Sequence, residues 1–357
     1  MSLGAWGWSE HFEQAFALSA APGLIPARVM VQLRGGYHVH AEEGEFPAEV
    51  SGRFRHQCPH ASGYPVVGDW VVIGLMPNEH KAVIHAVLPR RTKFSRTAAG
   101  DATEEQILAA NIDDVFVVEA LDDEPNLRRL ERFLTLACES GATPAILLTK
   151  ADLCADPAAA VAQVQAKLGE TPVIAISSVS GAGMRELRSL LGTGRTSVLL
   201  GPSGVGKSTL TNALFGDELL DTQPARESDS KGRHTTTHRE LILLPTGGCI
   251  IDTPGLRELQ LWDGETGVKE AYADVEAIAS GCRFTDCRHE SEPNCAVLYA
   301  VKSGVLDPGR LESHRKLVRE LESLEMRQDV RARADQRRQM KVVQKSLRQH
   351  FKQRPRD

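Results

Sequence analysis

The fold is decided by residues 196–215, which read TSVLLGPSGVGKSTLTNALF. Within them, GPSGVGKS at 201–208 matches the pattern G-x-x-x-x-G-K-[ST], and it follows an apolar strand and opens a helical stretch, as a phosphate-binding loop does. Glycines let backbone N–H groups turn inward around phosphate oxygens, and the helix adds its positive N-terminal end. We therefore predict that Lys207 reaches the β- and γ-phosphates of a nucleotide and that the Ser208 hydroxyl ligates Mg²⁺.

The base of the nucleotide is expected to lie against a segment upstream of this loop. TKAD at 149–152 follows the apolar strand PAILL and has the form [NT]-K-x-D. The Asp152 carboxylate can accept two hydrogen bonds from guanine, whereas adenine presents the reverse pattern and would be rejected. Lys150 would pack its stem over the base. The next strand ends in backbone N–H groups that could contact the guanine oxygen, those of Ser177, Ser178 and Val179.

Two more segments are predicted to complete the phosphate and magnesium contacts. DTPG at 252–255 ends an apolar strand, so Asp252 would hold Mg²⁺ through water and the Gly255 N–H would meet the γ-phosphate. In HTTT at 234–237, one threonine would complete the Mg²⁺ shell, with Thr236 favoured over Thr235. The predicted GTP contacts are Thr149, Lys150, Ala151, Asp152, Ser177, Ser178, Val179, Gly201, Pro202, Ser203, Gly204, Val205, Gly206, Lys207, Ser208, Thr209 and Gly255.

These motifs occur in a rearranged order. Ordinary GTPases present the phosphate loop, the switch threonine, D-x-x-G, [NT]-K-x-D and the serine motif in that sequence, whereas here the last two come first. Strands and helical stretches alternate over residues 96–260, which predicts a mostly parallel sheet covered on both faces. Because all the motifs still end predicted strands, the same sheet can form from a different chain start. We predict a circularly permuted α/β GTPase domain over 96–260.

Residues 1–95 predict a small β-barrel. Five short segments are rich in β-branched or alternating residues and are separated by Gly, Pro or polar turns, and Gly35-Gly36 fits a tight hairpin between the first two. Five strands of this length suit an OB-like fold, although a small sandwich has the same signature. The segments are 28–34, 37–42, 48–54, 69–75 and 82–88.

Residues 261–357 predict a helical domain with a metal site, including a charged helical stretch at 311–328. A cysteine cluster in a chain that shows no secretion signal favours metal over disulfides. Three thiolates and one imidazole form a closed tetrahedral set, typical of structural zinc. The predicted ligands, spaced C-x₄-C-x-H-x₅-C, are Cys282, Cys287, His289 and Cys295. A second group in the first domain is interpreted as polar loop residues, namely His56, Cys58 and His60.

Composition and charge limit the class of partner. Apolar residues make up 41% and charged residues 25%, as in soluble globular proteins. No apolar run approaches the ~20 residues that span a bilayer, and the N-terminus lacks a secretory pattern, so we expect a cytoplasmic protein with no membrane partner. Residues 326–357 hold eleven Lys/Arg and three Asp/Glu, against 31 and 44 in the remainder. A basic tail on an acidic body suggests a polyanionic partner.

Together the motifs resemble one family, the ribosome small-subunit-dependent GTPase A or YjeQ/RsgA family, over essentially the whole chain. The resemblance implies a monomer that binds GTP and GDP, with Mg²⁺ as the nucleotide's cofactor and one structural zinc. It also implies binding to the 30S subunit near its decoding region, where subunit-stimulated GTP hydrolysis drives release during late maturation. The barrel, zinc domain and tail would contact 16S ribosomal RNA. The matching segments are PVVGDWV (65–71), EEQILAANIDDVFVVEAL (104–121), LTKADL (148–153), GPSGVGKST (201–209), GRHTTT (232–237), IDTPG (251–255) and the cysteine cluster.

One position departs from familiar GTPases. Many carry Gln directly after D-x-x-G to orient the attacking water, but here that residue is Leu256. His234 is the candidate replacement, and the resemblance points the same way, because a histidine can accept a hydrogen bond from water at neutral pH. His234, Lys207 and Thr236 form the predicted catalytic set.

Two other functions are open. A permuted GTPase could serve the large subunit, but such proteins generally lack both the barrel and the cysteine cluster. An RNA-binding assembly scaffold could hold nucleotide only structurally, but Lys207, Ser208 and Asp252 are all present, which favours hydrolysis.

Overall fold

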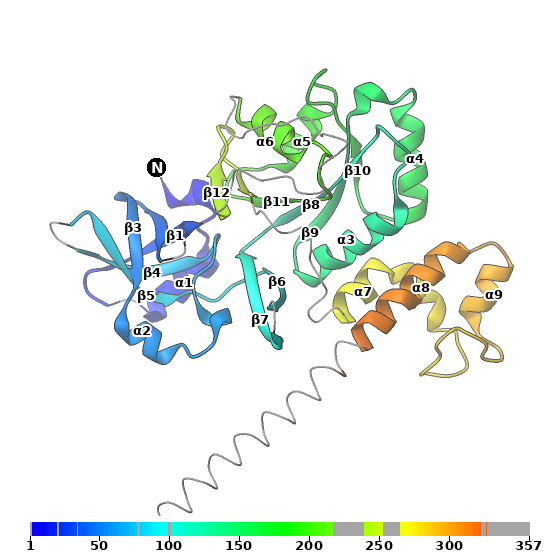
Figure 1. Ribbon diagram of the computed structural model, residues 1–357, viewed down its shortest axis with the longest axis horizontal. Helices are drawn as coiled ribbons and strands as arrows, with labels where there is room; N and C mark the ends of the chain where they lie inside the picture. Colours follow the sequence, from blue (N-terminus) through cyan, green and yellow to red (C-terminus); the bar gives the residue numbers. More distant parts are fainter. Residues whose placement is uncertain are drawn as a thin grey trace, which may run out of the picture.

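The computed structural model describes residues 2–19, 21–33, 35–76, 79–98, 101–216, 239–252, 265–322 and 326. Figure 1 shows a strand-rich N-terminal body in blue to cyan, a central α/β body in green and a helical C-terminal body in yellow to orange. Several predictions fall outside the described residues and remain predictions from sequence. They concern the tail at 327–357, the residue pair 260/261 at the second domain boundary, and His234, Thr235, Thr236, Gly255 and Leu256.

Five strands close the N-terminal barrel. Strand β1 pairs antiparallel with both β2 and β4, and β3 pairs in parallel with β5, so the strand order β1-β2-β3-β5-β4 returns to β1. Closure excludes the sandwich and confirms the OB-like barrel. The strands are β1 (Leu24–Gln32), β2 (Tyr37–Ala41), β3 (Gly44–Val50), β4 (Trp70–Met76) and β5 (Lys81–Val87).

The barrel differs from the sequence prediction in a few places. The third strand was predicted to run to residue 54, but the strand ends earlier and helix α2 (Gly52–Gln57) follows it. The Ser51 hydroxyl accepts a hydrogen bond from the Phe54 N–H at 3.1 Å and so caps the start of this helix. The turns η1 (Leu3–Trp6) and η2 (Ala61–Gly63), helix α1 (Glu10–Ser19) and a hairpin of β6 (Lys93–Ala98) with β7 (Asp101–Ala110) were not predicted. The sequence pattern missed α1 because only Phe12 of that helix is fully buried, packing on Trp70.

The central sheet has the order β10-β9-β8-β11-β13-β12, in which only β12 runs antiparallel. This confirms the mostly parallel α/β fold. Its strands are β8 (Asp114–Ala120), β9 (Thr143–Thr149), β10 (Val173–Ala175), β11 (Thr196–Leu200), β12 (Arg239–Leu243) and β13 (Cys249–Asp252), and its helices are α3 (Leu127–Glu139), α4 (Pro157–Leu168), α5 (Met184–Leu190) and α6 (Lys207–Phe215), with a short turn η3 (Ala151–Leu153).

Both faces of this sheet are covered, because successive strand residues point to opposite sides. In β8, Val115 and Val117 pack in one cluster with residues of α3 and α4. Their neighbours Phe116 and Val118 pack in a second cluster with residues of α5 and α6. Continuous burial along β8 therefore reflects two cores, one on each face of the sheet.

The barrel and the central sheet are joined by hydrogen bonds. Strand β1 pairs with β12, with Val31 opposite Glu240 and Gln32 opposite Arg239, so one sheet continues from one body into the other. Beside this junction lies the fully buried Arg28, whose guanidinium donates to the carbonyls of Trp6 (2.7 Å) and Asn111 (3.2 Å) and to Thr196 Oγ1 (3.1 Å). Burial lowers the pKa of Arg28 to about 10, so the side chain is still charged at neutral pH.

The C-terminal body packs on α3. It contains α7 (Glu265–Ala271), α8 (Ala273–Ala279) and α9 (Ala296–Lys302), followed by a helix over 308–322. That last helix agrees with the predicted helical stretch as far as the description extends. Arg310 joins the bodies, since it pairs with Asp274 of α8 at 2.6 Å and with Glu131 of α3 at 3.1 Å. Among the described helices, none is long and apolar enough to cross a bilayer.

Candidate functional site

The predicted phosphate loop connects β11 to α6, at the carboxyl edge of the central sheet. Gly201 lies so close to β8 that a Cβ there would meet the Val118 carbonyl oxygen at 2.3 Å, so only glycine fits. Gly206, at φ 90°, ends the loop at the start of α6. The Lys207 ammonium donates to the carbonyls of Gly201 (2.8 Å) and Pro202 (2.6 Å), which holds it within the loop.

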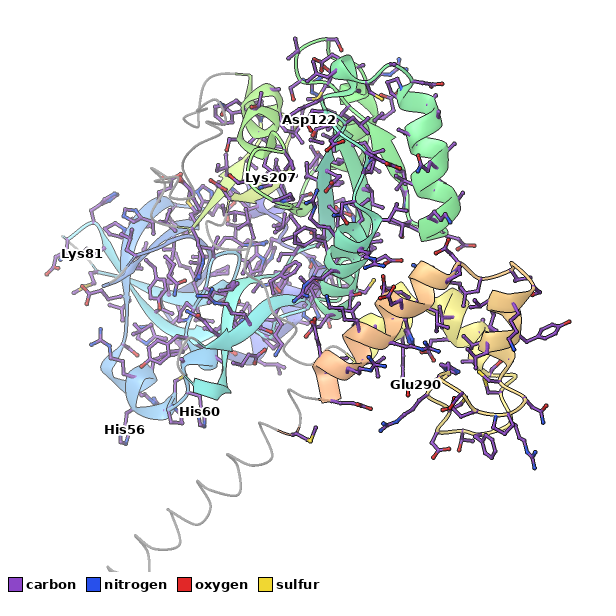
Figure 2. The ribbon with its side chains drawn as sticks, turned by 45° about the vertical axis from the view of Figure 1, so that its right-hand side comes forward. His56, His60, Lys81, Asp122, Lys207 and Glu290 are labelled. Atoms are coloured by element: carbon purple, nitrogen blue, oxygen red, sulfur yellow. The ribbon has the colours of Figure 1, made fainter. Side chains whose placement is uncertain are left out.

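The loop leaves most of its predicted contact residues accessible. Its anchors, Gly201 and Val205, are buried. The residues that would face a phosphate or Mg²⁺ are exposed or half-buried, namely Pro202, Ser203, Gly204, Gly206, Lys207, Ser208 and Thr209. In Figure 2, Lys207 lies on the same part of the central body as Asp122.

The predicted base-reading segment lies directly beside this loop. The buried Thr149 hydroxyl donates to the Val205 carbonyl at 2.6 Å, and lies 3.1 Å from the Glu119 carbonyl. This contact joins the end of β9 to the phosphate loop although the residues are 56 positions apart. Two motifs that are distant and permuted in sequence therefore form one continuous edge of the site.

Asp152 is tied to the serine motif. Its Oδ1 accepts a 2.5 Å hydrogen bond from the hydroxyl of the fully buried Ser177, at the end of the neighbouring strand β10. The Ala151 N–H donates to the Ile176 carbonyl at 3.1 Å and holds the two loops together. Asp152 itself is exposed, so its carboxylate is accessible to a ligand.

The serine motif is folded around Ser177. The N–H of Val179 donates to the Ser177 hydroxyl at 3.2 Å, and Ser180 N–H does so at 3.0 Å. Val179 is 84% exposed and Ser178 half-buried. Of the three predicted N–H groups, two are thus engaged within their own loop, that of Val179 with the Ser177 hydroxyl and that of Ser177 with the Ala182 carbonyl at 2.9 Å.

Asp252 ends β13 beside the phosphate loop. Strand β13 pairs in parallel with β11, with Ile251 opposite Val198, so Asp252 lies at the edge where β11 turns into the loop. This placement brings Asp252 to the same side of the sheet as Ser208, as a shared Mg²⁺ shell requires.

One neighbour of the site escaped the sequence analysis. Asp122, which follows β8, forms an ion pair with the Lys150 ammonium. Its signal was the acidic pair that follows the apolar strand DDVFVVEAL, because the carboxyl ends of neighbouring parallel strands meet at one edge.

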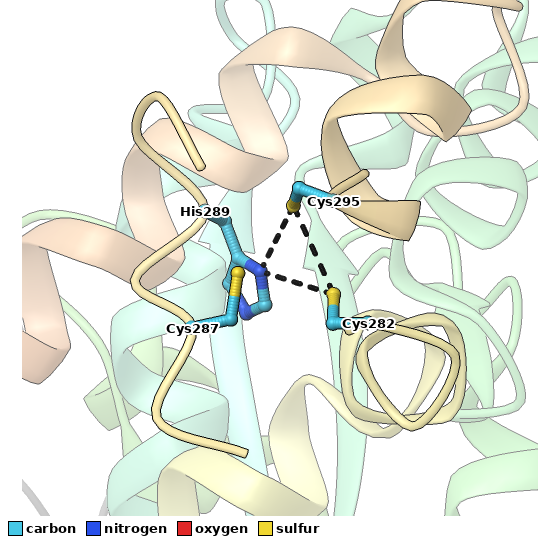
Figure 3. A group of neighbouring side chains, drawn as sticks. All are labelled: Cys282, Cys287, His289 and Cys295. Carbon is cyan, nitrogen blue, oxygen red and sulfur yellow. Dashed lines mark hydrogen bonds between the residues drawn. The ribbon is translucent and has the colours of Figure 1, made fainter. Parts of the chain in front are cut away.

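The cysteine cluster closes into a compact group between α8 and α9 (Figure 3). The Sγ of Cys282 lies 3.6 Å from His289 Nδ1 and 3.8 Å from Cys295 Sγ, and His289 Nδ1 lies 3.4 Å from Cys295 Sγ. The ligand atoms of all four residues, Cys287 included, lie within 4.8 Å of one another. A tetrahedral zinc with Zn–S near 2.3 Å and Zn–N near 2.0 Å would separate its ligand atoms by about 3.6–3.8 Å, so the residues fit that ion.

The surroundings favour the ligating forms of Cys282 and His289, whereas burial and the neighbouring Cys295 and Cys282 raise the pKa of the Cys287 thiol to about 11. Burial alone would raise the pKa of Cys282, but backbone N–H groups of Val297 and Ala296 at the start of α9 bring it below its usual value. Burial lowers the pKa of His289 and so favours the neutral imidazole.

The second histidine and cysteine group does not converge. His56 and His60 are exposed on the outer side of the barrel (Figure 2), and Cys58 donates to the His60 carbonyl. Among the described residues, the only group that brings such ligand atoms together is the C-terminal one. The interpretation of 56–60 as a loop was wrong for His56, which lies in the last turn of α2.

Comparison with known proteins agrees with this arrangement. The model of the RsgA GTPase family matches residues 87–262. The small ribosomal subunit biogenesis GTPase RsgA of Opitutus terrae is 45% identical, with 96% of each chain covered. That of Streptomyces coelicolor is also 45% identical, covering 95% of this chain and 92% of the relative.

Two solved structures share the fold. The crystal structure of YjeQ from Thermotoga maritima superposes with a TM-score of 0.63 at 28% identity, covering 84% of this chain and 98% of that one. YloQ, described as a circularly permuted GTPase, gives a TM-score of 0.60 at 24% identity, covering 84% and 96%. With the phosphate loop, the base-reading segment and the cysteine cluster in place, the identity over nearly the full length shows that this chain belongs to the RsgA family of GTPases.

Proposed function

We propose that this protein hydrolyses GTP in the biogenesis of the small ribosomal subunit. The observation that supports this most is the contact of Thr149 with Val205, because it joins the segment predicted to read guanine to the predicted phosphate loop despite the permuted order. The relatives named above are small ribosomal subunit biogenesis GTPases and are matched over nearly their whole length.

The phosphate end of the site would use groups from two strands. Lys207 lies within the loop and would exchange its two carbonyl partners for the β- and γ-phosphates. Ser208 and Asp252 would hold Mg²⁺, the Asp through water, and Thr236 or Thr235 would complete its shell. Mg²⁺ would neutralise charge on the phosphates, while this chain's residues position the triphosphate.

At the base end, the Asp152 carboxylate and the amides of the serine motif would read guanine. The ion pair with Asp122 would hold the Lys150 ammonium so that its stem lies along the base. Hydrolysis would need a group to orient water, and His234 is assigned that role because Leu256 cannot accept a hydrogen bond.

The partner would be the 30S subunit and its 16S ribosomal RNA. Hydrolysis stimulated by the subunit would release a monomeric protein after a late maturation step in the cytoplasm. The tail at 326–357, with its excess of eight positive charges, would add a salt-sensitive attraction to RNA. The barrel and the cysteine-bearing body lie on different sides of the GTPase domain (Figure 1), so both can reach an RNA surface.

GTP turnover measured alone, with 30S and with 50S subunits tests this proposal. Stimulation by 30S only is expected. Stimulation by 50S would favour the large-subunit alternative, and binding of GTP without turnover under any condition would favour the scaffold. ATP serves as the control nucleotide, and its equal use would contradict the role of Asp152.

The cysteine cluster is proposed to hold one structural zinc. The four converging side chains would fill all four positions of a tetrahedral zinc, so no position would be open for catalysis. Metal analysis of the purified chain should give one zinc per molecule. The variant Cys295→Ser should lose it, whereas Cys138→Ser, which changes a cysteine of α3 outside the cluster, should keep it.

A further inference from the structure

A pocket lies where the barrel meets the first strand residue of β12 in the GTPase domain. Its volume is about 560 Å³, within the range of small-ligand sites. The β1–β2 hairpin, α2 and the β6–β7 hairpin contribute to its lining, as does Arg239 at the start of β12. In barrels of this class, the loop between the first two strands is one of those that bind oligonucleotides.

The lining combines aromatic and cationic groups. Tyr37 and Tyr64 are both half-buried, and Arg55 is exposed beside them. Burial raises the pKa of Tyr37 to about 12, and Tyr64, Asp69 and Arg55 all act electrostatically on the same hydroxyl. Asp69 does not line the pocket and is paired with Arg90 at 2.7 Å. None of the described residues that line the pocket is acidic, although the chain as a whole carries a net charge of −5.

Two further cations, Arg239 and Arg96, lie at the opposite wall or beside it. Arg239 donates to Gln32 Oε1 at 3.2 Å, and Arg96 donates to Gln106 Oε1 at 3.0 Å, where Gln32 and Gln106 both line the pocket. Burial and then the charge of Arg96 lower the pKa of Arg239. Both guanidiniums donate to amide oxygens of residues that line the pocket, so each is held in place by a neutral partner.

We propose that this pocket binds a single unpaired nucleotide of an RNA strand. An exposed base would stack against a tyrosine ring, since base–aromatic stacking tolerates any base. The 5′- or 3′-phosphate would meet Arg55 on one wall or Arg239 on the other. The choice of RNA rests on the proposed function, while the ring-and-cation chemistry comes from the pocket alone.

The position of Arg239 gives the pocket a route to the nucleotide site. Arg239 stands three residues after Thr236 in the sequence, and β12 pairs with β13, which ends at Asp252. A phosphate held by Arg239 would therefore act on β12, which follows the predicted switch threonine and pairs with β13, the strand that ends in the predicted Mg²⁺ contact Asp252.

The test uses the full chain and a short single-stranded RNA of mixed sequence that carries one fluorescent 2-aminopurine. Stacking should quench the fluorophore on binding. We expect Tyr64→Leu to abolish the quench and weaken binding about tenfold, and Tyr64→Phe, which keeps the ring, to restore both. Arg55→Ala should lower the salt dependence of binding by about one single-strand phosphate, a slope change near 0.7.

Arg53→Ala is the matched control, because Arg53 is exposed on the same helix but does not line the pocket. It should leave the quench unchanged. Arg55 is also exposed, so its variant stays informative if Tyr64→Leu fails to fold.

Any of three results would overturn the proposal. In the first, Tyr64→Leu and Arg55→Ala both behave like Arg53→Ala. In the second, a free mononucleotide displaces the labelled RNA as well as an unlabelled RNA strand does, and in the third, the pocket variants bind RNA normally but no longer bind the subunit. The last would indicate a ribosomal protein as the occupant. GTP turnover with 30S, measured in the wild type and in Arg53→Ala, tests the proposed function separately.

Discussion

Lys150 shows how one residue aligns the base-reading segment. It is one of five non-glycine residues with positive φ among those described, at 56°, a conformation that costs about 1–2 kcal/mol. Two backbone hydrogen bonds hold the turn on either side, from Leu121 N–H to the Thr149 carbonyl and from Ala151 N–H to the Ile176 carbonyl. The turn allows Lys150 to pair with Asp122 while Asp152 pairs with Ser177. Strain held in this way is common at ligand sites.

The first prediction concerns the base. Asp152→Asn replaces one hydrogen-bond-accepting carboxylate oxygen by an amide NH₂ that donates. The NH₂ group cannot accept from the exocyclic amine of guanine, but it can donate to the carbonyl that xanthine has at the same position. GTP should bind about 100-fold more weakly, since a hydrogen bond to a charged group contributes about 1.5–3 kcal/mol, while XTP should bind better than to the wild type. Competition binding with both nucleotides measures this.

Its control is Asp156→Asn, which changes a helix-capping residue of α4 away from the predicted base contacts. Unaltered preference for GTP in Asp152→Asn would remove Asp152 from base recognition.

The second prediction concerns water. His234→Ala should keep GTP binding and lose stimulation by the subunit, because the imidazole is assigned to orienting the attacking water. Comparing nucleotide affinity with turnover in the presence of 30S separates the two effects. Normal stimulated turnover in this variant would rule the histidine out.

At the scale of elements, the site depends on contacts between loops that follow different strands. Thr149 ends β9 and joins both the phosphate loop and the end of β8 through its hydroxyl. Because this side chain is buried, the Val205 carbonyl has no water to replace the contact. The hydroxyl therefore aligns two motifs as well as stabilising them.

The third prediction follows from this contact. Thr149→Val keeps the shape but leaves the Val205 carbonyl without its donor, so the free energy of unfolding should fall by about 1–3 kcal/mol and GTP should bind more weakly. Chemical denaturation and nucleotide titration measure the two effects. Thr143→Val, at the exposed start of the same strand, is the control and should change neither. Equal behaviour of the two variants would contradict the proposed alignment.

At the scale of the molecule, the barrel and the GTPase domain share a sheet and a buried cation. Arg28 stands on β1 and donates to groups of three segments, Trp6, Asn111 and Thr196. A buried cation that satisfies several acceptors is costly to remove, because those acceptors then lose their partner. The two bodies should therefore unfold together.

The fourth prediction tests that coupling. Arg28→Met fills similar space without donors, and should lower the free energy of unfolding by about 3 kcal/mol. Hydrogen exchange of β1 amides should accelerate more than that of β8. Arg53→Met on the exposed face of α2 should stay within about 0.5 kcal/mol of wild type. Uniform acceleration across both bodies would show that Arg28 contributes stability without coupling them.

The fifth prediction concerns the C-terminal body as an output of the switch. DTPG at 252–255 is followed after few residues by α7, which packs on α3, so a change at the switch should be transmitted to this body. Hydrogen exchange over 265–322 should differ between the GDP form and a GTP-analogue form. Identical exchange in the two forms would contradict the idea.

The sequence determined by itself the features that depend on short spacings. The phosphate loop at 201–208, the TKAD turn and the four cysteine-cluster positions each need only a few adjacent residues of the right type. Most strands and helices of the central domain were predicted because β8, β9 and β11 are buried on both faces and α3 is strongly amphipathic. The residues near 51–54 were mistaken for strand because a helix cap there competes with a β-branched pattern.

Only the tertiary structure decided what depends on distant pairing. The barrel closes because β1 pairs with β4 and β3 pairs with β5, and it joins the central sheet because β1 pairs with β12. One pocket is lined by residues far apart in the chain, namely Tyr37, Arg55 and Arg239. Asp122 became part of the site only when neighbouring strands placed their ends together. Ser177 was predicted from the sequence, and the structure adds the bond of its hydroxyl to Asp152. A local pattern records which face of an element is apolar but not which element covers it, and that choice is made by the packing of the whole chain.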